Sequence, residues 1–312
     1  MIDLAAIRTA SERIQPYVVR TPMLGSRSLS ERLGTRVSLK VEAFQRTGSF
    51  KPRGAINQLL GLSDDQRARG VVGFSGGNFA QGLAYAGQQL GVATTVVMPE
   101  GTPSNYVDAT RGYGANIELT RSMSQAIDRV DELSADGLAA VHPFDNLDMI
   151  HGNGSVGLEI VADAPDATDV VVSIGGGGFI AGVAAAVKGL LPQARVWGVE
   201  TEGADAMSLA LAAGKPVTIE PTSIAKTLAA PWVSELTLAA AQEYVDGVTV
   251  VSDAAAIAAL EYILERTKIL TEPASSCTVA AAEELVLGEH VVIVLCGGNV
   301  SLADVAQWRD SY

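Results

Sequence analysis

Short runs of apolar, often β-branched residues recur along the chain, and each leads through a glycine-rich break into an alanine-rich stretch with helical periodicity. This alternation is typical of βα units in a parallel sheet. At four of these junctions the break is pronounced, and we expect buried strands there at residues 37–44, 70–75, 169–174 and 290–295. The same pattern predicts further strands at 92–98 and 195–200, helices near 122–135, 236–245 and 254–268, and an amphipathic first helix that ends before Pro16.

The position of the breaks predicts a single ligand-binding edge. In an open α/β sheet, ligands lie beyond the carboxyl ends of the strands, where helix N-termini present free N–H groups. We therefore expect all four breaks to open on the same side of one sheet. Polar stretches at 64–69 and 143–153 bracket an inserted lobe. We expect a large domain of residues 1–66 and 147–312 and a small domain of residues 67–146.

The composition narrows the class of protein. With 35 acidic against 22 basic residues, a net charge of −13 and no dense Lys/Arg cluster, the 312-residue chain lacks the cationic surface of a nucleic-acid binder. Its two cysteines, Cys277 and Cys296, form no CxxC pair, which excludes a disulfide framework or four-thiolate zinc site and suits a reducing cytoplasm. The longest nearly apolar run, 170–187, contains five glycines, so we expect no membrane span. Early charged residues argue against a secretory signal.

The tetraglycine at residues 175–178 is the strongest candidate for an anion site. Residues without Cβ let the backbone approach an anion, and the following helix adds its positive end, so the segment can bind phosphate without a cation. It does not match GxxxxGK(S/T), which favours a monophosphate over a magnesium nucleotide. The alternative is a tight turn for close packing, for which one glycine would suffice.

Lys51 is the candidate nucleophile. It precedes Pro52, which suits the first turn of a helix, so its amine is expected at a helix N-terminus on the same side as the glycines. A positive helix end and apolar surroundings disfavour the ammonium form, as Schiff-base chemistry requires. A lone lysine is more often a solvated surface cation. In combination with a phosphate cradle, however, Lys51 indicates pyridoxal phosphate.

Two further side chains follow predicted strand ends. Asn78, in SGGN, either offers its amide to a phenolic oxygen on a ring or caps the helix that follows. Cys296, in CGGN, either presents its thiol to a ligand or is a small buried hydrophobe. The residues alone leave both alternatives open.

Two other motifs are typical of serine hydrolases and of dinucleotide-binding proteins, but the residues around them do not fit these classes. Residues 73–77 match GxSxG around Ser75, but His290 lies at the start of its strand, on the far side of the sheet from Ser75. Residues 152–157 match GxGxxG without a preceding buried strand, so we expect a hinge or a helix-start loop there. The histidines show no HExxH spacing, which leaves a zinc enzyme unsupported.

Five motifs in register carry a family resemblance, namely GSFKPRGA, SGGNFAQG, GGGGF, TEPASS and CGGN. Over nearly its whole length the chain resembles the fold-type II pyridoxal-phosphate enzymes, in particular serine/threonine dehydratases and serine racemases. The resemblance implies a two-domain, three-layer α/β parallel-sheet fold of the tryptophan synthase β class, with pyridoxal 5′-phosphate as cofactor, and we expect a homodimer. It implies β-elimination from a small β-hydroxy amino acid such as L-threonine or L-serine, giving a 2-oxo acid and ammonia. The alternatives on this fold are β-replacement and serine racemisation.

The resemblance also implies roles for single residues. Lys51 matches the lysine that forms a Schiff base with the cofactor and then acts as acid and base at Cα. Asn78 matches the residue bonded to the cofactor's 3′ oxygen, 175–178 the phosphate loop, and Phe50 the ring beside the pyridine. Cys296 takes the place of a neutral residue at the pyridine nitrogen, which favours β-elimination over a long-lived carbanion. The loop that holds the substrate carboxylate matches Ser75, Gly76, Gly77 and Asn78.

Three positions depart from the family pattern. Gly76 replaces the serine that acts on the opposite face in racemases, so we expect no efficient racemisation. Phe79 replaces a histidine that is common after the asparagine, which removes that residue's usual hydrogen bond. Lys226 replaces a family residue in the SIAKT segment and adds a cation near the edge of the cofactor, so we expect an effect on substrate preference.

The cation site implied by the resemblance is incomplete. Glu200 and the carbonyl of Ala204 match two ligands, but Ala206 stands where the family has an aspartate, with Asp205 one residue early. We therefore expect no divalent ion. Glu200 and Asp205 are alternatively solvated surface carboxylates, or part of a monovalent or water-rich site.

Overall fold

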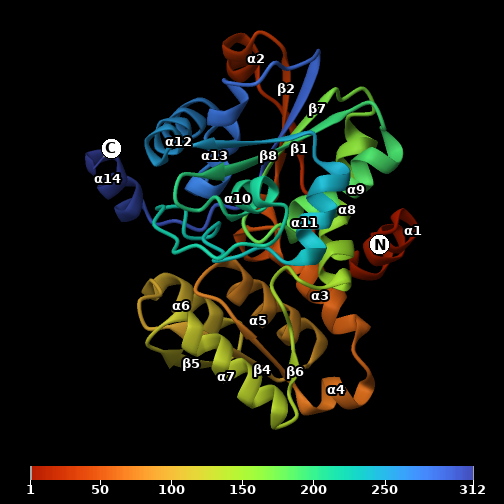
Figure 1. The fold of residues 1–312 in the computed structure, drawn as a ribbon, viewed down its shortest axis with the longest axis vertical. Coiled ribbons are helices and arrows are strands. Elements are labelled where there is room, and N and C mark those ends of the chain that lie inside the picture. The colour runs from red at the N-terminus through yellow and green to blue at the C-terminus, as the bar shows by residue number, and fades with distance from the viewer. Residues whose placement is uncertain (1, 312) are drawn as a thin grey trace.

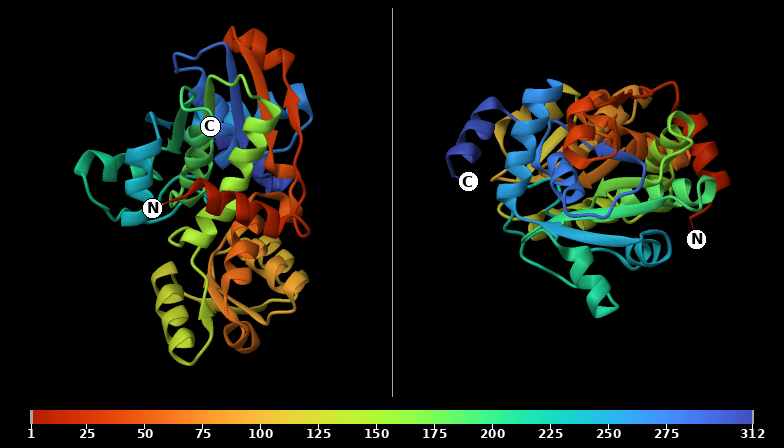
Figure 2. Two further views of the ribbon diagram at one scale, coloured as in Figure 1. Left: turned by 90° about the vertical axis from the view of Figure 1, so that its right-hand side faces the viewer. Right: turned by 90° about the horizontal axis from the view of Figure 1, so that it is seen from above.

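The structure, a computed structural model, describes residues 2–311. It contains two separate β-sheets, of six and four strands, which lie in the two parts of an elongated molecule (Figures 1 and 2). Both labelled chain ends belong to the part with the six-stranded sheet.

The six-stranded sheet has the order β1-β2-β10-β7-β8-β9 and is parallel except for the short edge strand β1. Its strands are β1 (Met23–Gly25), β2 (Arg36–Val41), β7 (Asp169–Ser173), β8 (Arg195–Thr201), β9 (Gly247–Val251) and β10 (His290–Leu295). The central strands β7 and β10 are buried along their whole length. Continuous burial is expected for parallel strands that are covered on both faces.

Helices cover both faces of this sheet. In Figure 1, α12 and α13 lie on one side of it, and α8 and α9 on the other. The helices of this part are α1 (Leu4–Ile14), α2 (Arg27–Leu33), α3 (Lys51–Gly61), α8 (Leu147–Asp163), α9 (Gly178–Leu190), α10 (Ala206–Ala213), α11 (Glu235–Tyr244), α12 (Asp253–Thr267), α13 (Pro273–Ala282) and α14 (Leu302–Ser311). Two short 3-10 turns, Glu42–Phe44 and Arg46–Gly48, lead from β2 to α3.

The four-stranded sheet is all parallel and has the order β5-β4-β3-β6. Its strands are β3 (Val71–Phe74), β4 (Thr94–Pro99), β5 (Asn116–Thr120) and β6 (Ala139–Ala140). Around it lie α4 (Asp64–Arg69), α5 (Asn78–Leu90), α6 (Ser104–Gly112) and α7 (Met123–Ala135). Helix α3 packs against both α5 and α8 and so connects the two parts.

The main predicted strands and helices are confirmed, but the predicted arrangement of the breaks on one sheet is wrong. Strand β3 belongs to the four-stranded sheet, whereas β2, β7 and β10 belong to the six-stranded one. The pattern of single strands contains no information about which sheet a strand joins. The predicted strand at 37–44 is also shorter, because the chain turns after Val41.

The predicted hinge or helix-start loop at 152–157 is also wrong, because these residues lie inside α8. A Cβ at Gly152 would lie 2.4 Å from the carbonyl oxygen of Arg53, and one at Gly157 would lie 2.6 Å from that of Val183. The glycines therefore allow α8 to pack closely against α3 and α9. Among the described residues, no helix is long and apolar enough to cross a membrane.

Candidate active site

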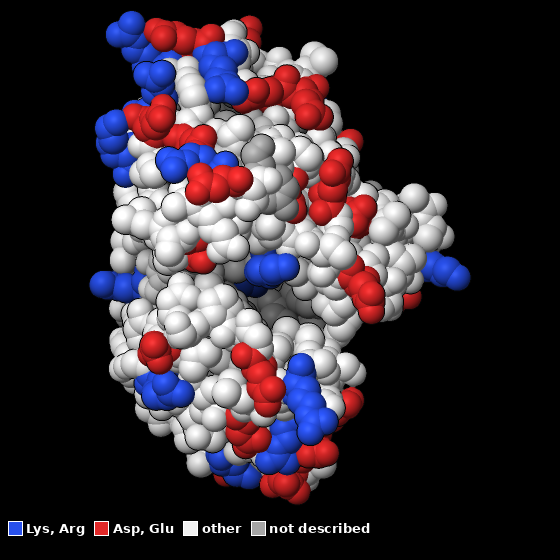
Figure 3. Space-filling view, turned by 90° about the vertical axis from the view of Figure 1, so that its left-hand side faces the viewer, with Lys and Arg blue, Asp and Glu red and all other residues white. Residues whose placement is uncertain are grey.

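The four glycine-rich breaks meet at one pocket between the two parts of the molecule, where Figure 3 shows the surface hollowed. The predicted cofactor-binding residues all line this pocket, namely Phe50, Lys51, Asn78, Gly175, Gly176, Gly177, Gly178 and Cys296. An adjoining cavity shares Lys51 and Asn78 and is also lined by Ser75, Gly76 and Gly77. The structure thus brings the predicted cofactor-binding and substrate-binding residues together.

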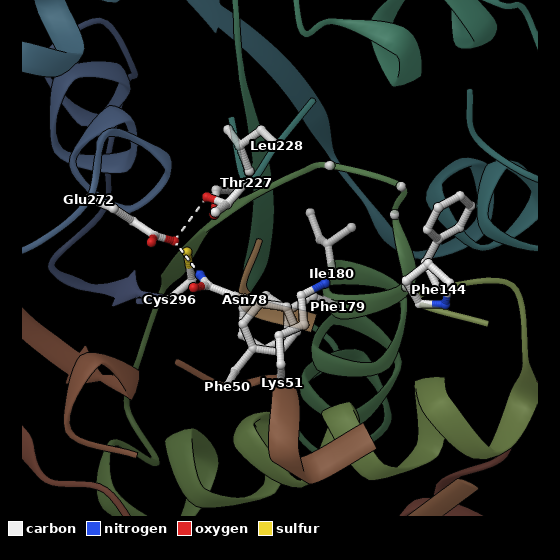
Figure 4. Close-up of a pocket in the computed structure, with 16 residues that line it drawn as sticks. Phe50, Lys51, Asn78, Phe144, Phe179, Ile180, Thr227, Leu228, Glu272 and Cys296 are labelled. Carbon is white, nitrogen blue, oxygen red and sulfur yellow. Dashed lines mark hydrogen bonds between the residues drawn. The ribbon is translucent and has the colours of Figure 1, made fainter. Parts of the chain in front are cut away.

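Lys51 is the first residue of α3, and its side chain extends into the pocket. In Figure 4 the amine lies between Asn78 and Cys296 on one side and Phe144 on the other, and no hydrogen bond joins it to the residues drawn. Burial lowers the pKa of Lys51 from 10.5 to about 8, and the nearby Cys296 and Glu272 offset this only in part. A pKa of about 8 leaves about a tenth of the amine neutral at pH 7, far more than an ordinary lysine has, and the neutral amine is the nucleophile.

The tetraglycine forms the turn between β7 and α9. Gly177, at φ +89°, adopts a left-handed conformation that favours glycine, and as N-cap of α9 it provides no side-chain hydrogen bond to the first turn. The first N–H groups of α9 are therefore available to an anion. A Cβ at Gly176 would lie 2.2 Å from the Phe144 ring, so the glycines also serve close packing. The packing interpretation is confirmed, and the phosphate site stays a prediction.

Asn78 is held in a hydrogen-bonded network. Its Nδ2 donates to Oε1 of Glu272 at 2.8 Å, and its Oδ1 accepts from Nδ2 of Asn299 at 2.8 Å. Thr227 Oγ1 also donates to Glu272 Oε1, at 3.0 Å (Figure 4). The capping alternative for Asn78 is wrong, because the N-cap of α5 is Gly77 and the Asn78 amide is used elsewhere. One N–H of the amide remains for a ligand.

Glu272 is a buried pocket residue that the sequence analysis did not single out. It is buried, and its Oε2 has no hydrogen-bond partner among the described residues. Burial raises its pKa to about 6, against the hydrogen bonds from Asn78 and Thr227. The available signal was a carboxylate directly before Pro273 at the start of an apolar helix, within the TEPASS motif.

Cys296 follows β10 and is buried beside Ser275, with 3.3 Å between Sγ and the Ser275 Oγ. Burial raises the pKa of its thiol to about 12, so the thiol is neutral. A neutral side chain at this strand end is what the sequence analysis expected.

Phe50 lies on the wall of the pocket. Its ring stacks on Phe179, with centroids 3.8 Å apart and an angle of 17° between the planes. The amine of Lys51 lies 4.8 Å from the Phe50 ring centroid. The stack gives the pocket a flat aromatic wall.

The comparisons with known proteins decide the family. The pyridoxal-phosphate dependent enzyme family matches residues 14–297. The chain belongs to this family. It is 39% identical to the L-threonine ammonia-lyase of Thermotoga maritima, over 97% of this chain and 77% of that protein. It is 38% identical to the phenylserine dehydratase of Ralstonia pickettii, over 98% and 95%. Maize serine racemase matches with a TM-score of 0.94 at 33% identity, over 99% and 97%. The predicted fold class is confirmed.

The pocket of this pyridoxal-phosphate dependent enzyme fits the cofactor chemically. The start of α9 offers N–H groups to a phosphate, and Lys51 offers an amine of lowered pKa. Asn78 retains an N–H, and Cys296 presents a neutral thiol. Each functional group of pyridoxal phosphate therefore has a candidate partner in one pocket.

The carboxylate of Glu200, the candidate cation ligand, is held by the start of helix α10. Glu200 is fully buried, so its interpretation as a solvated surface carboxylate is wrong. Its two oxygens accept hydrogen bonds at 2.8 Å from the backbone N–H groups of Met207 and Ser208, at the start of α10. The described residues contain no group of three or more His, Cys, Asp or Glu side chains that could hold a metal. Both oxygens of the Glu200 carboxylate therefore already accept hydrogen bonds from the α10 backbone.

Proposed function

We propose that this enzyme catalyses β-elimination from a β-hydroxy amino acid such as L-threonine or L-serine and releases a 2-oxo acid and ammonia. The observation that carries the proposal is the Lys51 amine, which has a lowered pKa and lies in one pocket with the tetraglycine turn and a neutral thiol. A protein that only binds phosphate has no need of such an amine. The names of the relatives, threonine ammonia-lyase and phenylserine dehydratase, describe the same reaction type.

The proposal gives each residue of the pocket a role. Pyridoxal phosphate, when bound, would supply an electron sink for the Cα–H bond. Lys51 would hold the cofactor and would then take the Cα proton on its amine. Gly175–Gly178 would hold the phosphate, and Phe50 would pack beside the ring. Asn78 would bind the 3′ oxygen, and the Cys296 thiol would serve as the neutral partner of the ring nitrogen. The substrate carboxylate binds at the loop formed by Ser75, Gly76, Gly77 and Asn78.

We further propose that residues 67–146 form a small domain that closes over the substrate. The strands of the four-stranded sheet all lie within this range, and the pocket lies between the two sheets. Closure would exclude water while the Cα–H bond breaks. We also propose a homodimer in the cytoplasm, in line with the family and with the buried free cysteines.

The visible absorption spectrum of the purified protein with added pyridoxal phosphate tests the proposal. We expect a protein-bound band in the wild type that Lys51→Ala lacks. With threonine and serine we expect 2-oxo acid formation that falls at least about 10³-fold in Lys51→Ala. A wild type without the band, after cofactor has been supplied, would contradict the proposal.

Serine racemisation is the second candidate, because maize serine racemase has the same fold. Gly76 argues against it, since glycine has no side chain to move a proton on the face opposite Lys51. The space is also filled, because a Cβ at Gly76 would lie 2.8 Å from Oγ1 of Thr102. Chiral analysis of reactions with L-serine should show no D-serine, and substantial D-serine would favour the racemase.

A further inference from the structure

The cavity beside Lys51 is larger and more apolar than a threonine side chain needs. Its volume is about 360 Å³, and its lining includes the Ser75–Gly77 loop, Lys51 and Gly176 of the tetraglycine turn. A volume of this order is typical of pockets for larger ligands, of about 300–1,000 Å³. The methyl group of threonine would fill a small part of it.

Apolar side chains from both parts of the molecule form its walls. Phe74 at the end of β3, Pro99 at the end of β4 and Met123 at the start of α7 come from the four-stranded part. Phe144, which packs against Gly176, and Trp232 also line the cavity. Their ring centroids lie 6.3 Å apart with 64° between the planes, an edge-to-face arrangement that can extend to a further ring.

The Phe144 part of the aromatic wall is held in place by its neighbours. The backbone N–H groups of Phe144 and Asp145 donate to Nδ1 of His142, at 3.3 and 2.8 Å. Phe144 also packs against Gly176, where a Cβ would lie 2.2 Å from its ring. A preorganised apolar wall contributes to binding because little side-chain entropy is lost.

Apart from Lys51, the described walls of the cavity offer no buried cation to an anionic side chain. Among the described residues that line it, the charged ones are Lys51 and Lys226, and none is acidic. Lys51 takes part in the proposed reaction, and Lys226 is exposed to solvent. A carboxylate on the substrate's β-carbon would therefore lie among apolar side chains without a buried partner.

We propose that the preferred substrate carries an aryl group on its β-carbon, as in 3-phenylserine. The proposal rests on the β-elimination proposed above. In that reaction the Cα–H and Cβ–OH bonds break and water leaves. The resulting enamine tautomerises to the imine, and one water then hydrolyses the C=N bond to give the 3-aryl-2-oxo acid and ammonia. The aryl group lies against Phe144 and Trp232, and Lys226 lies outside the contact.

The test compares kcat/KM of the holoenzyme for L-phenylserine, L-threonine, L-serine and 3-hydroxyaspartate. We expect phenylserine to exceed threonine by about tenfold or more, as burial of a phenyl ring implies. Trp232→Ala should lower the phenylserine value about tenfold and leave the serine value within about twofold. Phe44→Ala, which removes an exposed aromatic ring outside this cavity, is the matched control and should change neither value.

An inhibition assay on the wild type keeps the test independent of variant folding. L-Phenylalanine, which lacks the leaving hydroxyl, should inhibit at a concentration about tenfold below that of L-alanine. Turnover of threonine or 3-hydroxyaspartate in preference to phenylserine would overturn the aryl proposal and leave β-elimination intact. An equal loss for serine and phenylserine in Trp232→Ala would also overturn it. No 2-oxo acid from any of the four amino acids would instead refute the β-elimination.

Discussion

Two cations that lie two residues apart at the start of α3 have opposite surroundings. The guanidinium of Arg53 is fully buried and forms ion pairs at 2.8 Å with both Glu42 and Glu159. Burial alone would lower the pKa of Arg53, but the two carboxylates outweigh it and raise the pKa. Lys51 has no such partner in Figure 4, and burial lowers its pKa to about 8.

The difference shows how one helix serves both structure and chemistry. Lys40 also pairs with Glu159, at 2.6 Å, so two cations and two carboxylates form a neutral buried cluster that joins β2, α3 and α8. Every charge in this cluster has a partner of opposite sign. The cluster holds the first turn of α3 in place, and Lys51 on that turn keeps an amine that is free to react.

The largest effect on stability is expected when Arg53 is replaced. Arg53→Met leaves the buried carboxylates of Glu42 and Glu159 with too few partners, and we expect a loss of about 3–5 kcal/mol in the free energy of unfolding. Urea denaturation measures it. Lys51→Met is the matched control at the same helix end, and its cofactor-free form should lose less than about 1 kcal/mol at pH 7. Equal losses in the two variants would contradict the distinction between the two cations.

A second test uses the pH dependence of stability. In the cofactor-free protein the pKa of Lys51 is about 8, against an ordinary value of 10.5, so between these pH values the unfolded chain binds more protons. The stability of the wild type should therefore rise with pH over this range, by at most about 3 kcal/mol. Lys51→Met should lack this component. Parallel pH profiles for the two proteins would show that burial does not disfavour the charged amine.

The fold could be predicted where local pattern decides it. The runs that became β7 and β10 are continuously apolar, and the glycine breaks after them mark the strand ends. The separation into two sheets could not be predicted, because β3 has the same pattern as the strands of the larger sheet. The glycines inside α8 were misread because their neighbours in α3 and α9 are distant in sequence.

The site could be predicted where a residue's chemistry follows from its place at a strand end. Lys51, Asn78 and Cys296 lie at or next to such breaks, and all line the pocket. Glu272 was missed because its function depends on hydrogen bonds to Asn78 and Thr227, which come from other elements. Sequence spacing contains no information about such partners.

A smaller effect, on kcat, is expected from substitution of Cys296, the neutral thiol of the pocket. Cys296→Ser keeps an uncharged donor beside Ser275, so we expect kcat to change by about threefold or less. Cys296→Asp would add a buried carboxylate close to Glu272, and we expect a far larger loss. Steady-state kinetics of the two variants measure both. A loss above about a hundredfold in Cys296→Ser would show that the thiol itself takes part in the reaction.

The smallest effect is expected for Lys226, a third cation whose side chain is exposed at the rim of the cavity. An exposed charge contributes about 0–1 kcal/mol to an interaction, because water already solvates it and salt screens it. Lys226→Ala should therefore change kcat/KM for phenylserine by about twofold or less, with Lys226→Arg as the control that keeps the charge. With 3-hydroxyaspartate, whose carboxylate could reach the rim, the loss should be larger and should shrink at high salt. A strong, salt-independent loss with phenylserine would place Lys226 with the buried cations, since only a desolvated charge escapes screening.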